Sequence, residues 1–135
     1  MSDTFQLEIV TPEKMVVRTT AEEMQIPGKN GYLGILPGHA PLITELAVGE
    51  ISYKSQGHTQ VLAVAWGFAE VLPEKVTILA ETAERPDEID TARAQKAQQR
   101  AEERLKSGSP DVDYARAENA LQRAETRLQV AGKKQ

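Results

Sequence analysis

The chain of 135 residues contains no cysteine and little histidine or aromatic side chain. The absence of cysteine excludes disulfide bonds, thiolate metal sites and a cysteine nucleophile, and it fits a reducing compartment. With two histidines, acid–base chemistry through imidazole would depend on His39 or His58. Hydrophobic residues make up 40% of the chain, enough for the core of one domain, although only six of them are aromatic.

Long apolar runs are also missing. No stretch approaches the roughly 18 consecutive apolar residues that a transmembrane helix needs. The first ten residues, MSDTFQLEIV, carry Asp3 and lack the basic region and apolar stretch of a secretory signal. We therefore expect a soluble protein that meets a membrane only through a partner.

Charge is unevenly divided along the chain. The formal net charge is −4, but residues 1–84 hold 5 basic and 11 acidic residues, whereas residues 85–135 hold 11 basic and 9 acidic residues. Either the two parts face different partners, or each only has a solvated surface. Charge alone leaves both interpretations open.

The first part of the chain has the period of β-strands. Phe5, Leu7 and Ile9 alternate with polar residues, and the run Val61–Ala65 is apolar on both faces. Further short runs are separated by segments rich in Gly, Pro, Asn or Ser, such as TPEK, PGKNG and PGHAP. This spacing predicts an antiparallel β-sandwich or barrel, with no room for a helix before residue 86.

After Arg85 the period becomes helical. Two alanine-rich stripes follow steps of three and four: Ala94, Ala97, Ala101, Leu105; and Tyr114, Ala117, Leu121, Ala124, Leu128, Ala131. We expect Pro86 in the first turn of the first helix, Gly108 as its stop, and Ser109 and Pro110 at the start of the second. The sequence thus predicts an α+β chain with domains 1–85 and 86–135, the second an antiparallel helical hairpin. Because alanine buries little area, we expect the hairpin to be held weakly enough to move.

The segment GKNGYLGILPGHAPL is a candidate phosphate loop, with glycines at 28, 31 and 34 beside Lys29. Such loops open into a helix, which Pro37 blocks. We therefore predict that the glycines serve tight turns with positive φ. His39 lacks a nucleophile in an elbow context, and neither histidine has metal-ligand spacing, so no catalytic and no metal site is predicted.

The arginines of the second part form a sharper candidate. Arg93 and Arg100 are seven residues apart and Arg123 and Arg127 are four apart, so each pair projects from one helix face. If those faces meet, four guanidinium groups converge, and they suit phosphate oxygens such as those of a nucleotide triphosphate. Two alternatives stay open: a solvated face with helix ion pairs, and nucleic-acid binding, for which the charge and the single aromatic residue Tyr114 are a poor fit.

Three segments carry a resemblance to a known family: GYLGILPGHAPLIT, GFAEVLPEKVTILAETAER and the run from Ile89 to Ala94. Together they resemble the epsilon subunit of bacterial F-type ATP synthase, in the family's order and over nearly the whole chain. The resemblance implies a sandwich of about ten strands, bound to the gamma subunit and resting on the ring of c subunits, followed by a regulatory helical hairpin. It also implies that the extended helices reach the beta and alpha catalytic subunits, meet an acidic segment of beta, and impede ATP hydrolysis.

Some bacterial members bind ATP in the folded hairpin, and this chain resembles them residue by residue. The resemblance implies that the adenine and ribose end is held by Glu84, Ile89, Asp90, Arg93 and Ala94, and the phosphates by Arg100, Arg123 and Arg127. No other cofactor is expected. Two positions depart from the pattern: Ala65-Trp66-Gly67-Phe68 stands where many members have Ser-Gly-Gly-Phe, and Pro86 is not typical.

The resemblance therefore predicts a non-catalytic rotor subunit at the cytoplasmic face of the bacterial cell membrane. It would couple proton flow to ATP synthesis, restrain hydrolysis, and bind ATP as a regulatory ligand. No nucleic-acid partner is expected. The alternative from another class is a free-standing ATP-sensing module without a rotary partner; an enzyme that hydrolyses nucleotides is a third.

Overall fold

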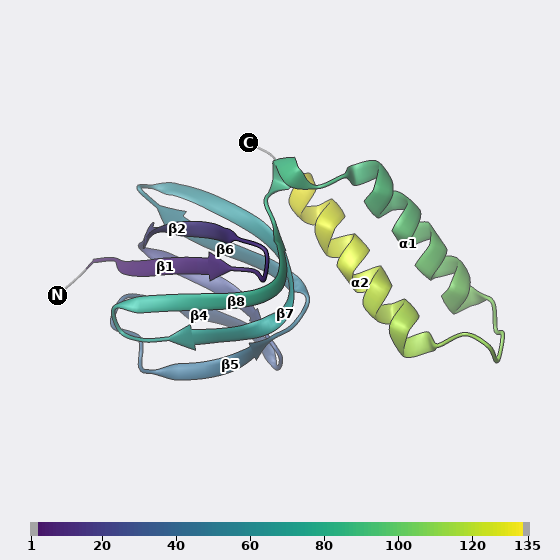
Figure 1. Cartoon of the computed structure of the whole chain (residues 1–135), viewed down its shortest axis with the longest axis horizontal. Helices are drawn as coiled ribbons and strands as arrows, with labels where there is room; N and C mark the ends of the chain where they lie inside the picture. The colour runs from purple at the N-terminus through teal and green to yellow at the C-terminus, as the bar shows by residue number, and fades with distance from the viewer. Residues whose placement is uncertain (1–2, 134–135) are drawn as a thin grey trace.

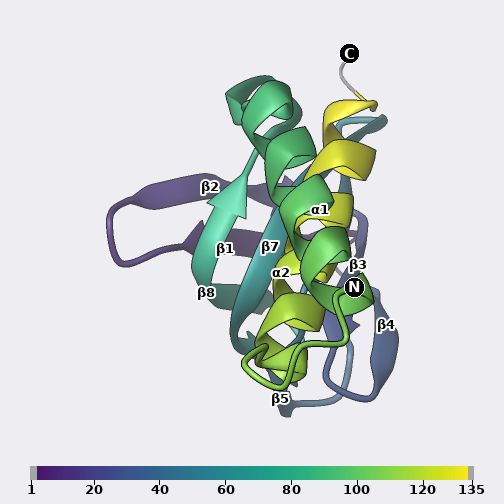
Figure 2. The same cartoon turned by 90° about the vertical axis from the view of Figure 1, so that its right-hand side faces the viewer.

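The structure is a computed structural model that describes residues 3–133. A β-sandwich is followed by two antiparallel helices that lie beside it (Figure 1, Figure 2). The strands of the described part are β1 (Phe5–Val10), β2 (Met15–Ala21), β3 (Glu23–Gly28), β4 (Gly31–Ile35), β5 (Leu42–Leu46), β6 (Gly49–Ser55), β7 (His58–Val71) and β8 (Lys75–Glu84). A 3₁₀ turn, η1 (Pro86–Glu88), leads to helices α1 (Thr91–Lys106) and α2 (Tyr114–Ala131). The predicted α+β architecture, a sandwich and then a helical hairpin, is confirmed.

The sandwich is folded from one hydrogen-bonded sheet that bends over itself. Its strand order is β2-β1-β8-β7-β5-β3-β4, and β6 pairs with both β3 and β7. The pairing of β1 with β8 is parallel and the other pairs are antiparallel. Within residues 3–133 there are eight strands instead of about ten. The count is lower because β7, 14 residues long, pairs with β6 along its first half and with β5 along its second, so one strand serves both layers.

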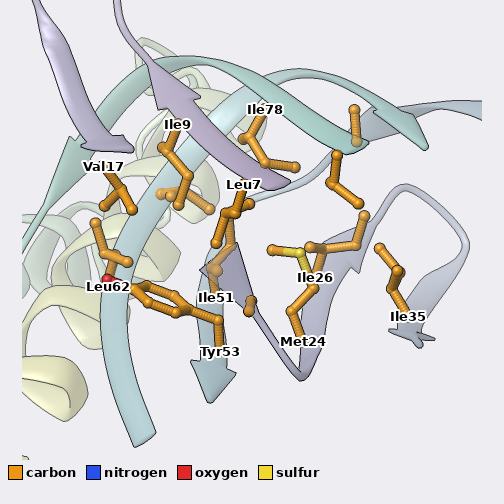
Figure 3. Packing of buried hydrophobic residues seen from close by; sticks show 14 of the residues in the cluster. Leu7, Ile9, Val17, Met24, Ile26, Ile35, Ile51, Tyr53, Leu62 and Ile78 are labelled. Atoms are coloured by element: carbon orange, nitrogen blue, oxygen red, sulfur yellow. The ribbon is translucent and has the colours of Figure 1, made fainter. Parts of the chain in front are cut away.

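The core lies between the layers and follows the predicted alternation. Phe5, Leu7 and Ile9 of β1 are almost completely buried, as the sequence predicted. Figure 3 shows Leu7 and Ile9 with side chains that the other strands contribute, including Ile26, Ile51, Leu62 and Ile78. Removing such apolar surface from water is the main favourable term of folding.

One strand is buried on both faces, as predicted for residues 61–65. Leu62 and Val64 of β7 point into the sandwich core, whereas Ala63, between them, joins a second cluster with Ile89 and Val130. This second cluster lies where the end of α2 covers the outer face of the sandwich. The continuous apolar run in β7 therefore has a simple cause: its outer face is the docking surface for the hairpin.

The alanine stripes form the seam between the helices. Ala94 and Ala101 of α1 and Ala117 and Ala124 of α2 are all buried. α2 lies against β6 and β7, whereas α1 packs mainly on α2. Neither helix within residues 3–133 is long and apolar enough to cross a bilayer.

Both helix starts differ from the prediction. Pro86 lies in η1, and α1 begins at Thr91 because the Asp90 carboxylate accepts a hydrogen bond from the backbone N–H of Arg93 at 3.1 Å. α2 begins at Tyr114 because Asp113 caps it in the same way, through the N–H of Arg116 at 3.1 Å. The predicted start at Ser109 and Pro110 is therefore wrong. An aspartate cap satisfies an N–H at the helix end as well as a serine does, so local sequence offered two equivalent starts.

The predictions for the glycines at the end of α1 and in the segment GKNGYLGILPGHAPL are confirmed only in part. Gly108, with φ +67, follows the helix end as predicted. Of the three glycines expected at positive φ, Gly31 adopts it (φ +130), whereas the prediction is wrong for Gly28 and Gly34, which have ordinary strand conformations. Gly28 and Gly31 flank the tight turn between β3 and β4, where a Cβ on Gly28 would lie 2.8 Å from the carbonyl oxygen of Gly31. The prediction that this segment forms strands and a turn is confirmed, because β3 and β4 meet there and the next element is β5.

Candidate functional site

An open cleft of about 890 Å³ lies between the hairpin and the sandwich. Its sandwich wall comes from the end of β8 (residues 81–84) and from the turn between β1 and β2 (Thr11, Glu13, Lys14). The opposite wall comes from α1 and α2, which Figure 1 shows side by side. The volume falls in the range of small-molecule sites, which span roughly 300–1,000 Å³.

Arginine side chains dominate this cleft, which we call the arginine cleft. Six line it, three from α1 and three from α2: Arg93, Arg100, Arg104, Arg116, Arg123 and Arg127. Lys14 adds a seventh positive charge, against the carboxylates of Glu13, Glu81 and Glu84. The surplus of four positive charges favours an anionic ligand, and planar guanidinium groups suit phosphate oxygens because they donate hydrogen bonds in pairs.

Five of the eight residues predicted for the ATP site line the arginine cleft: Glu84, Arg93, Arg100, Arg123 and Arg127. The other three lie outside its lining. Ile89 is buried against Ala63 and Val130, Asp90 caps α1, and Ala94 is completely buried. The structure thus brings the predicted arginines together and uses Ile89, Asp90 and Ala94 to seat and start the first helix.

Sequence reasoning did not include Arg104 and Arg116 in this anion site. Arg104 lies four residues after Arg100 in α1, and Arg116 lies seven residues before Arg123 in α2, so the same helical spacing points to both. Arg104 is near the end of α1 and Arg116 near the start of α2, which places them at the loop end of the hairpin. They extend the charged lining of the cleft away from the sandwich core.

Arg127 is paired with Glu84 across the joint between α2 and β8. Nη2 of Arg127 donates a hydrogen bond to Oε2 of Glu84 at 3.0 Å. Nε lies 2.8 Å from Oε1 but is not aligned as a hydrogen bond, so this second contact is electrostatic. Both side chains are less than one third exposed (26% and 29%), which limits screening by water. This pair fastens the hairpin to the wall of the arginine cleft.

Arg123 contacts the single tryptophan of the chain. Its guanidinium carbon lies over the Trp66 ring, 5.0 Å from the ring centre, in the range of a cation–π interaction. Sequence reasoning missed this contact, because Trp66 is in β7 and Arg123 in α2 and no periodic pattern connects them. The departure noted at Trp66 is therefore a contact between the sandwich and the hairpin.

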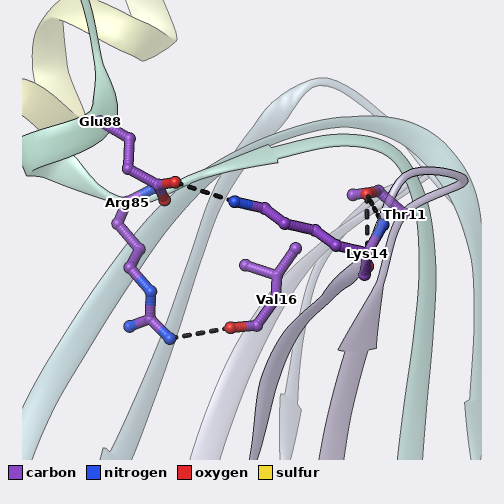
Figure 4. Close-up of polar contacts among 5 residues, drawn as sticks. All are labelled: Thr11, Lys14, Val16, Arg85 and Glu88. Carbon is purple, nitrogen blue, oxygen red and sulfur yellow. Dashed lines mark hydrogen bonds and ion pairs between the residues drawn. The ribbon is translucent and has the colours of Figure 1, made fainter.

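A second set of polar contacts holds the connection between the two parts (Figure 4). Nη2 of Arg85 donates to the carbonyl oxygen of Val16 at 2.9 Å, and Nζ of Lys14 lies 3.2 Å from Oε2 of Glu88. The backbone N–H of Arg85 donates to Oε1 of Glu88 at 3.0 Å. This backbone hydrogen bond, helped by Lys14, lowers the pKa of Glu88 below its ordinary value of 4.5. Glu88 is therefore ionised at neutral pH and links η1 to the turn between β1 and β2.

The described lining of the cleft includes no histidine and no metal-ligand cluster. Neither histidine lines it, and no group of three His, Cys, Asp or Glu within the described range 3–133 could hold a metal ion. His39 lies in the turn before β5, with Nδ1 2.7 Å from the carbonyl oxygen of Ala40. The arrangement of arginine donors is suited to holding an anion.

Comparison with known protein families gives two matches that together cover nearly the whole chain. The beta-sandwich domain of the ATP synthase delta/epsilon chain matches residues 4–86, and the long alpha-helix domain of the same chain matches residues 87–132. Among curated relatives, the ATP synthase epsilon chain of Koribacter versatilis is 72% identical over 111 residues, covering 82% of this chain and 78% of the relative. The epsilon chain of Geotalea uraniireducens is 49% identical over 111 residues, covering 82% and 80%.

Two solved structures share the fold. A chain in the Euglena gracilis mitochondrial ATP synthase, a structure of OSCP, F1 and the c-ring, superposes with a TM-score of 0.83 at 24% identity, covering 97% of this chain and 82% of that one. A chain in the central stalk and c-ring of the Tetrahymena thermophila mitochondrial ATP synthase superposes with a TM-score of 0.57 at 12% identity, covering 96% and 94%. At these identities the likeness establishes the fold.

Proposed function

This chain belongs to the family of F-type ATP synthase epsilon subunits, and we propose that it serves as a non-catalytic subunit of the central stalk, the rotor of a proton-translocating enzyme. In this role it couples proton flow to ATP synthesis. Its C-terminal helices restrain ATP hydrolysis, and its folded hairpin binds ATP as a regulatory ligand. The complex would hold it as a peripheral protein at the cytoplasmic face of the bacterial cell membrane.

The proposed partners of the sandwich, residues 1–85, are the gamma subunit and the c ring. Support comes from exposed apolar side chains on neighbouring strands: Ile43 in β5, Phe68 in β7 and Leu79 in β8 are all more than half exposed. Phe68 and Leu79 are direct cross-strand neighbours. Large apolar side chains gathered on one face of a sheet are typical of a protein interface.

The proposed partners of the hairpin, residues 86–135, are the beta and alpha catalytic subunits. To reach them the helices would leave the sandwich, which requires that the closed arrangement be only slightly favoured. The small alanine side chains of the seam and the few polar ties between α2 and the sandwich support such a balance. The released helices would present arginines to an acidic segment of beta.

The observation that carries the proposal of ATP binding is the arginine cleft. Arg93 and Arg100 of α1 reach it from one helix, and Arg123 and Arg127 of α2 reach it from the other, so a triphosphate would bind both helices at once. Arg93 and Arg100 have no side-chain partner among the described residues, which leaves their donors free for a ligand. Binding would therefore favour the closed hairpin by linkage.

Calorimetric titration of the full-length chain with ATP tests this proposal. We expect the wild type to bind ATP, and Arg100→Gln to bind about 10- to 100-fold more weakly, since a hydrogen bond to a charged group contributes roughly 1.5–3 kcal/mol. Arg18→Gln is the matched control, because Arg18 is exposed in β2, outside the cleft, and its loss changes the net charge equally. Absence of binding to the wild type, or equal affinity in Arg100→Gln and Arg18→Gln, would remove the site.

The alternative is a free-standing ATP-sensing module without a rotary partner. Affinity purification of the tagged chain from its own cells separates the two. The stalk proposal predicts that alpha, beta, gamma and c subunits are recovered with the chain. Recovery of none of them would favour the free-standing module.

A further inference from the structure

Trp66 and Arg123 meet at the joint between the sandwich and the hairpin. Cζ of Arg123 lies 5.0 Å from the centre of the Trp66 ring, and both side chains are half-buried, so water screens the attraction only in part. Arg123 also borders a gap of only about 30 Å³ with Thr82 of β8 and Thr126 of α2. Arg123 thus lies between this small gap and the open arginine cleft, which it also lines.

The backbone of Trp66 is held in a conformation that a bulky residue rarely adopts. Its φ is +51, in the left-handed region, where a side chain carries a steric cost. Gly67 follows with φ +130, and a Cβ there would collide with the carbonyl oxygen of Leu79. The N–H of Trp66 donates to the carbonyl oxygen of Ala47 at 3.3 Å, where β7 changes partner from β6 to β5. The left-handed backbone at Trp66, held by these contacts, thus fixes the direction in which its side chain leaves β7.

A strained residue that the surrounding fold holds in place points to a functional role. We propose that Trp66 is a positioning residue that clamps Arg123 against the sandwich. The clamp keeps the hairpin closed before any ligand binds. It also holds Arg123 at the wall of the arginine cleft, which this residue lines.

The clamp leaves Arg123 able to bind an anion. The contact with the ring is not a hydrogen bond, and the Arg123 guanidinium group has no hydrogen-bond partner among the described residues, so its N–H donors remain available for phosphate oxygens. This second consequence rests on the ATP binding proposed above. The first, a hairpin held closed by Trp66 without nucleotide, does not.

Replacing Trp66 separates a clamp from a residue that only fills space. Trp66→Gly removes the ring and also relieves the left-handed backbone, because glycine adopts positive φ without steric cost. A clamp predicts opposite effects in the two parts of the chain: the sandwich keeps its stability or gains some, while the hairpin opens more often. A merely structural Trp66 predicts that both parts loosen together.

Amide hydrogen exchange of the full-length chain without nucleotide measures this directly. In Trp66→Gly and in Arg123→Gln we expect the amides of α1 and α2 to exchange roughly three- to ten-fold faster, and those of β1 and β8 to be unchanged or slower. Trp66→Phe, which keeps an aromatic face, should lie between Trp66→Gly and the wild type, and Arg18→Gln should match the wild type. Unchanged exchange in the helices, or faster exchange in the sandwich and helices alike, would overturn the clamp.

Fluorescence and ATP titration complete the test. Trp66 is the only tryptophan, so the fluorescence of the chain reports on its ring alone. Without nucleotide, the emission should change in Arg123→Gln and not in Arg18→Gln. Unchanged emission in Arg123→Gln would overturn the contact. Where the wild type binds ATP, Trp66→Gly should weaken binding about three- to ten-fold, and equal affinity would overturn the positioning of Arg123. A wild type that binds no ATP would count against the proposed function, and hydrogen exchange would still decide the clamp.

Discussion

Arg127 in α2 holds the carboxylate of Glu84 at the end of β8, with Nη2 3.0 Å from Oε2 and Nε 2.8 Å from Oε1. The pair lies on the wall of the arginine cleft, so one contact both docks the hairpin and fixes an arginine beside the proposed anion. Closure of the hairpin and the shape of the site are therefore coupled. Changes at the docking contacts should alter both.

Glu84→Gln tests the docking role of this pair. The variant keeps the size of the side chain but removes its charge. We therefore expect the free energy that favours the closed hairpin over the open one to fall by roughly 1 kcal/mol, the scale of a partly exposed ion pair. Hydrogen exchange of the α2 amides should rise about five-fold, while the β1 amides stay unchanged. Glu81→Gln is the control, since Glu81 lines the same cleft and forms no ion pair with α2 among the described residues. Equal exchange in both variants would show that the pair contributes nothing to docking.

The contacts of Glu88 with the backbone N–H of Arg85 and with Lys14 make the connection to the hairpin sensitive to acid. The pKa of Glu88 is lowered in the folded chain, so its contribution to stability is present above the ordinary pKa of 4.5 and is lost as the pH falls through the folded value. The melting temperature of the wild type should therefore exceed that of Glu88→Gln at about pH 7, and this difference should shrink as the pH falls below 4.5. A difference that does not shrink in this range would contradict this assignment.

The alanine seam should not tolerate a larger residue. Ala101 is buried between the helices, and Ala101→Leu adds three carbon atoms where the helices are in contact. Overpacking of this kind costs typically 1–3 kcal/mol, and here it would push α1 away from α2. Ala92→Leu is the matched control, because Ala92 is exposed in the same helix. Thermal unfolding followed by circular dichroism should show a loss of helix stability in Ala101→Leu alone; equal curves would mean that the seam is loose.

Most of the fold could be predicted from periodicity, because local patterns encode it. The alternation of Phe5, Leu7 and Ile9 indicated a strand with one buried face, and the doubly apolar run in β7 indicated that both of its faces are covered. What periodicity could not predict was the choice between equivalent local signals. Asp113, and not Ser109, begins α2, although both residue types are good helix caps.

The candidate site was also predictable only in part. Helical spacing predicted that Arg93 and Arg100 share one face and that Arg123 and Arg127 share another, and the fold brings both faces to one cleft. Helical spacing could not predict the sandwich partners of Arg123 and Arg127. Trp66 and Glu84 lie in β-strands, far from these arginines in the sequence. Only the path of β7 and β8 brings them under the hairpin.

The most direct test of the central claim is the rate of ATP hydrolysis by the assembled ATP synthase carrying either the full chain or residues 1–85 alone. A hairpin that restrains hydrolysis predicts a higher rate for the complex with residues 1–85, with gamma and c subunits retained at the same ratio. An unchanged rate in a complex that retains those subunits would contradict the account.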